Sequence, residues 1–329
     1  MIIKLILAIV MLCSAYTIAD INHESIETGS TQRPDSHAPI GVMADHGHRL
    51  KEVMLSTRYM SMPMRTLFSG SSEINSSEVS GYSMVPDAMY MSMIMIGGMV
   101  GLNDKFTVMS MIGLADKSMT ATGMMSKSMN TSGITDMKLS GLYTFMKTAQ
   151  HVALAQVGLS LPIGSIDEKD SGTTRLAYPM QLGSGTYDIQ LSTTYTQFKK
   201  SFSFGGQLQT IVRTGKNSNG YRLGNQFSVT AWLSKVIHET VSVSIRLTRQ
   251  SRSDIEGADS TLMTTMSPAN STNTGLVNYS VATGANIQLP KQWSGSRVAV
   301  EYVVPVYQDV NNVQLGLDNT LTVGVQHLF

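Results

Sequence analysis

The sequence predicts an all-β fold, an antiparallel transmembrane β-barrel of about 12 strands with short periplasmic turns and long outer loops. Of the 329 residues 42% are hydrophobic and only 14% are charged, whereas about a quarter of the residues in a soluble domain are charged. Apolar and polar residues alternate with the two-residue period of a strand, in segments of about ten residues. That length lets a tilted strand cross a membrane.

The alternation is clearest between Tyr187 and Tyr195, where Tyr, Ile, Leu and Tyr alternate with Asp, Gln, Ser and Thr. The same pattern between Val241 and Thr248 places four apolar side chains on one face. The even number of strands suits a single-chain bacterial barrel. The predicted strands are 52–63, 88–99, 105–114, 136–146, 151–161, 186–198, 201–212, 226–235, 239–250, 278–289, 296–306 and 319–329.

The connections between the predicted strands alternate in length. Short turns follow the even-numbered strands at 101–105, 147–150, 199–200, 235–238 and 290–295, and long connections follow the odd-numbered strands, including 65–87, 115–135, 162–185 and 251–278. Outer-membrane barrels pair short periplasmic turns with long outer loops. The barrel is predicted to comprise residues 52–329. We expect its first strand to begin, and its last strand to end, on the periplasmic side of the membrane.

The two ends of the chain indicate export and assembly. Lys4, the apolar run 5–12 and the small residues before Asp20 predict a signal peptide over residues 1–19. Residues 20–51 are then a periplasmic N-terminal segment or a lumen plug. The last strand ends on Phe329 and is similar to the terminal strand by which barrels are recognised for assembly. We expect outer-membrane lipids and the barrel assembly machinery as partners, and location in the outer membrane of a Gram-negative bacterium.

Methionine is concentrated in the first strands, since 19 of the 24 methionines lie between Met43 and Met146. On the first strand they share a face with Arg58, and a charge facing lipid at mid-membrane costs about 2–4 kcal/mol. That face is therefore predicted to point into the lumen. The predicted lumen lining is Met54, Arg58, Met60, Met62, Met89, Met91, Met93, Met95, Met109 and Met111.

Two interpretations of this lining remain open. Thioethers bind soft ions such as Cu(I) or Ag(I), and His37, His46 and His48 stand just upstream as candidate metal ligands. Alternatively, methionine is a flexible, polarizable lining for irregular apolar ligands or fills a narrow barrel. Copper or silver is thus the one cofactor considered, and otherwise none is expected.

Several function classes are excluded by the sequence. The formal net charge is +1, without clusters of Lys and Arg among aromatic residues, so nucleic acid is not an expected partner. Cys13, the only cysteine, lies in the predicted signal peptide, which excludes a cysteine-based site in the mature chain. No hydrolase or nucleotide-binding motif is present, and we expect no enzymatic activity and no catalytic residues.

Five segments carry a resemblance to a known family: 37–46, 161–167, 178–188, 219–224 and 305–309. The chain resembles bacterial outer-membrane transporters of the phenol-degradation meta-pathway type. The resemblance implies a β-barrel and uptake of aromatic or other apolar compounds.

The predicted function is passive passage of small solutes, apolar or aromatic in character, through an outer-membrane channel or transporter. Soft-metal passage or binding through the methionine-lined lumen is the alternative. A non-conducting structural or surface-interaction barrel is the alternative of another class.

Overall fold

A computed structural model describes residues 33–329 apart from 124–126, 171, 173 and 291–294. Twelve strands in this part of the chain form the barrel, which confirms the predicted fold class and strand number. They are β1 (Val53–Met64), β4 (Met84–Gly101), β5 (Phe106–Gly123), β7 (Met137–Lys147), β8 (His151–Leu161), β9 (Asp188–Phe198), β10 (Phe202–Arg213), β12 (Gln226–His238), β13 (Val241–Arg252), β15 (Leu276–Gln288), β16 (Ser296–Gly316) and β17 (Thr320–Leu328).

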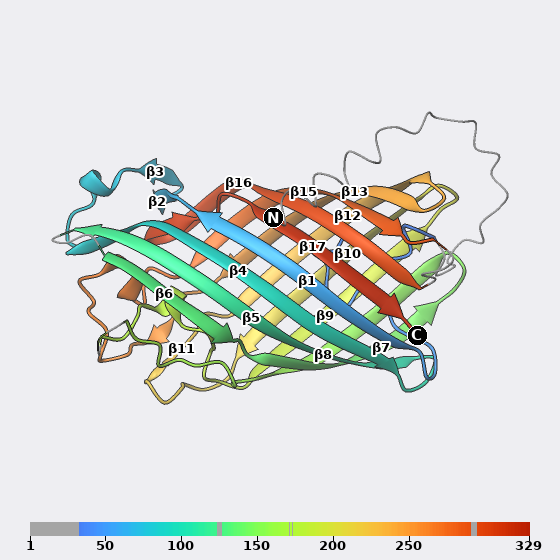
Figure 1. The fold of residues 1–329 in the computed structure, drawn as a ribbon, viewed down its shortest axis with the longest axis horizontal. Coiled ribbons are helices and arrows are strands. Elements are labelled where there is room, and N and C mark those ends of the chain that lie inside the picture. The colour runs from blue at the N-terminus through green and yellow to red at the C-terminus, as the bar shows by residue number, and fades with distance from the viewer. Residues whose placement is uncertain (1–32, 124–126, 171, 173, 291–294) are drawn as a thin grey trace.

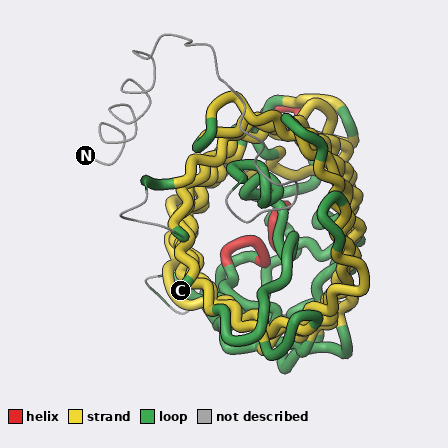
Figure 2. Tube along the Cα trace, turned by 90° about the vertical axis from the view of Figure 1, so that its right-hand side faces the viewer, coloured by secondary structure: helices red, strands yellow, loops and turns green. Residues whose placement is uncertain are grey.

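Each strand pairs antiparallel with its neighbours, and β1 closes the barrel against β17 through pairs that run from Met54 with Leu328 to Ser61 with Leu321. The strands are tilted around an elongated barrel (Figure 1). Seen from the end with the short turns, they form a closed ring that contains loop segments (Figure 2). Closure removes the unpaired edges that hydrocarbon does not tolerate.

The outer surface of the ring is apolar. Tyr90, Ile94 and Ile96 of β4 are each about half exposed, and β9 presents Ile189 and Leu191 outward while Asp188 and Ser192 are buried. Soluble monomers rarely expose apolar surface on this scale, whereas a lipid-facing barrel requires it. The protein is therefore located in the outer membrane of a Gram-negative bacterium, as the sequence predicts. Among the described residues, no helix is long and apolar enough to cross a membrane.

Some strands continue beyond the predicted bounds at the end with the long connections. β4 begins at Met84, β5 continues to Gly123 and pairs there with β6 (Lys127–Ile134), and β16 continues to Gly316 and pairs with β2 (Thr66–Gly70). The remaining short elements at this end are β3 (Ser72–Ile74), β11 (Tyr221–Arg222), β14 (Glu256–Gly257) and the 3₁₀ turns η2 (Ser76–Glu78), η3 (Tyr178–Met180) and η4 (Ser267–Ala269). These pairs lie where lipid no longer imposes the apolar period, so the sequence pattern does not reveal them.

Candidate functional site

Residues 33–52 are here called the lumen segment; residues 33–48 lie inside the barrel, and residues 49–52 are at its rim beside the short turn 101–105. Ile40 and Val42 are 2% and 3% exposed although no regular element contains them. Carbonyl groups of the segment accept hydrogen bonds from inward side chains of β1, β9, β10, β13 and β15: from Arg58 to Ile40, Thr194 to Ala44, Ser203 to Asp35, Ser242 to Pro34 and Asn286 to His37. Most of these donors lie near the short turns, so the segment occupies the half of the lumen at that end of the barrel.

Two glycines allow the lumen segment to approach the wall closely. A Cβ atom on Gly41 would lie 2.2 Å from Oε1 of Glu301 and 2.5 Å from Nη2 of Arg246. These two side chains form a buried ion pair of 2.6 Å between β13 and β16. A Cβ atom on Gly47 would lie 2.7 Å from Oγ1 of Thr144. The segment is therefore close-packed against opposite sides of the barrel.

The outer half of the lumen contains a cavity of about 620 Å³. Its lining comes from barrel strands and from the long outer connections, and the described residues of the lumen segment do not contribute. Eight methionines line it: Met62, Met64, Met89, Met91, Met93, Met95, Met111 and Met119. We call these eight residues the methionine wall.

The register places the methionines in rows across neighbouring strands. Met64 pairs with Met89, Met89 with Met119, and Met119 with Met129 of β6. Directly opposite residues of an antiparallel pair have Cβ atoms about 4.5–5.5 Å apart. The thioethers thus cover one continuous side of the barrel.

Next to the methionine wall the cavity lining becomes polar and carries Lys138, Asp188, Arg213 and Arg252. One row of paired positions leads from Met111 to Lys138, Ser160, Asp188 and Arg213. Asp188 and Arg213 form an ion pair. The Lys138 ammonium group makes no hydrogen bond or ion pair with a described residue, although its side chain is exposed to the cavity. An unpaired cation therefore stands beside the methionine wall.

Three long connections, 162–187, 214–225 and 253–275, cover the outer end of the cavity, and we call them the lid. Their buried apolar side chains pack on the strand methionines in one cluster: Leu176, Ala177, Tyr178, Met180, Tyr221, Ile255, Leu262 and Ala269 with Met89, Met119, Ala121 and Met129. Lys117 of β5 adds hydrogen bonds to the carbonyl groups of Pro179 and Gln181. The lid is thus attached to the same strands that carry the methionine wall.

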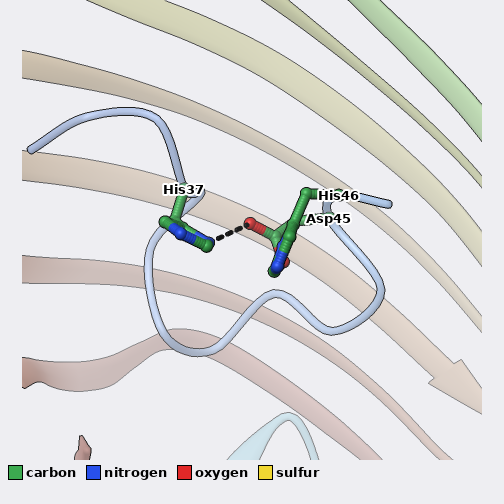
Figure 3. Close-up of side chains that lie close together, drawn as sticks. All are labelled: His37, Asp45 and His46. Atoms are coloured by element: carbon green, nitrogen blue, oxygen red, sulfur yellow. Dashed lines mark hydrogen bonds and ion pairs between the residues drawn. The ribbon is translucent and has the colours of Figure 1, made fainter. Parts of the chain in front are cut away.

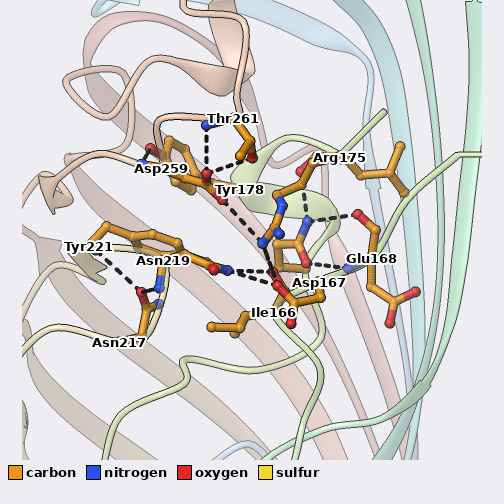
Figure 4. Close-up of polar contacts among 12 residues, drawn as sticks. Ile166, Asp167, Glu168, Arg175, Tyr178, Asn217, Asn219, Tyr221, Asp259 and Thr261 are labelled. Carbon is orange, nitrogen blue, oxygen red and sulfur yellow. Dashed lines mark hydrogen bonds and ion pairs between the residues drawn. The ribbon is translucent and has the colours of Figure 1, made fainter. Parts of the chain in front are cut away.

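Polar contacts join the three connections of the lid (Figure 4). Arg175 forms ion pairs with Asp167 and, at 3.2 Å, with Asp259. Asn219 donates to the Asp167 carboxylate at 3.0 Å. Hydrogen bonds from Asn219 and Arg175 lower the pKa of Asp167 against the opposing effect of burial.

The lumen segment also gathers three histidines around Asp45. His37 and His46 contact edge to face, with ring centroids 4.2 Å apart, and those of His46 and His48 are 4.9 Å apart. The Asp45 carboxylate lies beside both rings (Figure 3), 3.8 Å from Nδ1 of His37 and 2.8 Å from Nδ1 of His46. Burial, together with the nearby His46, lowers the pKa of His48 to about 3, so this imidazole is neutral at pH 7.

The residues predicted from the sequence fall into three places. Six of the predicted lining residues do line the cavity: Met62, Met89, Met91, Met93, Met95 and Met111. Met54 and Met109 pack with Ala44 of the lumen segment, Arg58 binds that segment, and Met60 pairs with Met93. His37, His46 and His48 lie together in the lumen segment. The predicted signal peptide, residues 1–19, and the boundary at residue 20 lie outside the described residues.

Other residues of the site were not selected from the sequence. Met64 and Met119 extend the methionine rows, and their spacing from Met62 and Met111 was a usable signal. The lack of a described partner for Lys138 depends on the three-dimensional arrangement of the strands, which the local sequence pattern does not reveal. Arg175 and Asp259 are brought together from two loops, and no local pattern predicts such a contact.

A solved outer-membrane structure shares this architecture. An outer-membrane channel from Pseudomonas putida F1 aligns over 87% of this chain and 98% of its own, with 12% identity and a TM-score of 0.62. A Pseudomonas aeruginosa FadL homologue aligns over 84% of this chain and 90% of its own, with 8% identity and a TM-score of 0.42. The first similarity shows the fold. No curated protein matches the sequence significantly.

A family model described as "Putative MetA-pathway of phenol degradation" matches residues 68–288, which is more than half of the chain. This match confirms the resemblance found in the sequence. The chain belongs to that family.

Proposed function

We propose that the protein is a passive channel for small apolar or aromatic solutes. The observation that carries the proposal is the methionine wall on one side of a cavity of about 620 Å³. Ligand pockets of about 300–1,000 Å³ accommodate small organic molecules. Because methionine is unbranched and polarizable, such a wall adapts to apolar ligands of different shape.

The polar side of the cavity narrows the class of solute. Lys138 pairs directly with Met111 in the register, so an unpaired ammonium group adjoins an apolar surface. Arg213 and Arg252 line the same side. A solute with an apolar or aromatic body and one carboxylate would place the body on the methionine wall and the anionic group on Lys138. We therefore expect aromatic carboxylates to pass faster than neutral compounds of the same size.

Passage requires movement at both ends of the cavity. The lid covers the outer end and the lumen segment occupies the periplasmic half. Both are attached by hydrogen bonds, ion pairs and packing, which thermal motion breaks one by one. Flux then follows the concentration gradient of the solute.

Liposome swelling with the refolded protein tests this function. We expect entry of benzoate and benzyl alcohol at rates above those of a sugar of similar size. Replacing Met62, Met91, Met93 and Met111 with Gln should lower the entry rate of the aromatic solutes relative to the sugar. The polar amide groups would bind water where the thioethers contact an apolar solute. Swelling with none of the solutes would support a non-conducting structural or surface-interaction barrel instead.

Soft-metal passage is the second candidate, since the paired rows of thioethers are also a possible path for Cu(I) or Ag(I). A Cu(I) titration compares the natural protein with a variant in which Met60, Met62, Met91, Met93, Met109 and Met111 are replaced by Leu. Loss of binding in the variant would support this candidate, and unchanged binding would remove it.

A further inference from the structure

The histidines of the lumen segment present three ring nitrogens without a hydrogen bond to any described residue, although Nδ1 of His37 lies 3.8 Å from Oδ2 of Asp45. Nδ1 of His37, Nε2 of His46 and Nε2 of His48 are buried and have no hydrogen-bond partner in the part of the chain that the structure describes. A buried polar atom left without a hydrogen bond destabilises the folded protein. Three such atoms on neighbouring rings indicate that the site is built for a ligand that accepts electron pairs or supplies hydrogen bonds.

Asp45 orients this group of rings. Its carboxylate accepts a hydrogen bond from the backbone N–H of Ala38 at 2.8 Å and lies 2.8 Å from Nδ1 of His46. A carboxylate on one ring nitrogen keeps the proton there and leaves the other nitrogen with a free electron pair. Metal-binding histidines are held in this way by carboxylates. Nε2 of His46, one of the unpartnered atoms, is then the nitrogen prepared for a metal.

The spacing also suits a single ion. Ligand atoms of His37, Asp45 and His46 all lie within 4.8 Å of one another. Ligand atoms on one tetrahedral metal are about 3.4 Å apart, so these three side chains already lie close to the spacing of a single coordination sphere. His48 is within reach as a further ligand, because its ring contacts that of His46.

We infer that His37, His46 and His48, oriented by Asp45, form a binding site for a divalent transition-metal ion of the Zn²⁺ or Cu²⁺ class. Imidazole and carboxylate ligands suit these borderline ions, whereas the thioethers of the methionine wall suit soft monovalent ions. The site is therefore distinct in place and in chemistry from the soft-metal path considered above. It does not depend on the proposed channel function.

A bound ion would join the two ends of one loop. His37 precedes the close approach of Gly41 to the wall, and His46 and His48 follow it. A metal bridging these positions fixes the loop between them and with it the part of the lumen segment that Arg58 and Thr194 hold. Metal would thereby stabilise the segment inside the barrel.

Arg297 supplies a means to identify the charge of the ligand. Burial, and after it the charge of this β16 residue, lowers the pKa of His37. Its guanidinium group donates to Gln326, and its Nε and Nη1 atoms are unpaired among the described residues. A cation at the histidines is repelled by Arg297, whereas an anion would be held by it.

The test uses residues 20–329, which include the lumen segment, refolded in detergent and purified without a histidine tag. Zn²⁺ is titrated by calorimetry, and Co²⁺ is added to record the absorption bands of a nitrogen-coordinated ion. We expect one ion per chain, and at least a 100-fold loss of affinity in H37A/H46A. The control H151A/H238A, which removes two histidines near the periplasmic turns, should bind as tightly as the natural protein.

The R297M variant separates metal from anion. Tighter Zn²⁺ binding than in the natural protein, by about threefold or more, supports the metal site. Three results would overturn the metal site. They are absence of Zn²⁺ binding, equal Zn²⁺ affinity of H37A/H46A and the natural protein, and a Zn²⁺ affinity of R297M that is unchanged or lower. Heat-modifiable migration in gels verifies that each variant has formed the barrel.

Discussion

At the scale of single residues, Lys138 is the side chain that most directly determines selectivity. Its ammonium group faces the cavity without a hydrogen bond or ion pair to a described residue. Hydrogen bonds to charged groups contribute about 1.5–3 kcal/mol. In K138M we therefore expect the uptake of an aromatic carboxylate to fall roughly tenfold relative to a neutral aromatic compound. Paired liposome swelling assays measure the ratio.

Lys147 provides a matched control for this substitution. It lies at the other end of β7, where it is exposed beside the short turn. K147M changes the net charge by the same amount but should leave the selectivity ratio unchanged. An equal loss of selectivity in both variants would show that overall charge, rather than the Lys138 position, favours anions.

At the scale of elements, the lid depends on Arg175, which connects the loops that contain Asp167 and Asp259. Breaking a buried ion pair on one side leaves a charge unpaired and costs about 3–5 kcal/mol. We expect R175M to release the lid while the barrel persists, which should increase single-channel conductance and cleavage of residues 253–275 by added protease. R222M serves as control because the Arg222–Glu256 pair is largely exposed and such pairs contribute little. The same cleavage rate in both variants would contradict the role given to Arg175.

Acid should open the same lid. Hydrogen bonds from Asn219 and Arg175 lower the pKa of Asp167, and a hydrogen bond from Lys127 lowers that of Asp170. A carboxyl group whose pKa is lowered by folding stabilises the folded state above its unfolded pKa, and this contribution disappears as the pH falls through the folded pKa. The lid should thus remain closed at pH 5 as at pH 7 and loosen below about pH 4. Conductance recorded from pH 7 to pH 3 checks this, and a change already complete at pH 5.5 would contradict it.

The sequence predicted the barrel better than the structures within it. The strands from Asp188 to Phe198 and from Val241 to Arg252 repeat a lipid-imposed alternation, so their existence follows from local spacing. Arg58 similarly indicated which face of β1 points inward, because of the cost of a charge in lipid. The Arg175–Asp259 pair joins two residues that lie 84 positions apart in the sequence, in loops that show no periodic pattern. Such contacts arise only from the folded topology.

At the scale of the whole molecule, the lumen has two parts, with the lumen segment in one and the cavity in the other. Removing residues 20–51 while keeping residues 1–19 should leave a folded barrel with a larger conductance, because the strands do not need the segment to pair with one another. Planar-bilayer recordings compare the truncated and natural proteins. Equal conductance would mean that residues 33–52 do not restrict the pore.

The paired rows of methionine have a consequence for cells under oxidative stress. Hydrogen peroxide and related oxidants convert a thioether into a sulfoxide, which is polar and chiral. Eight such groups line one cavity, so oxidation would turn an apolar surface into one that binds water. The protein would then admit fewer apolar compounds when oxidants are abundant, and reduction of the sulfoxides would restore their entry.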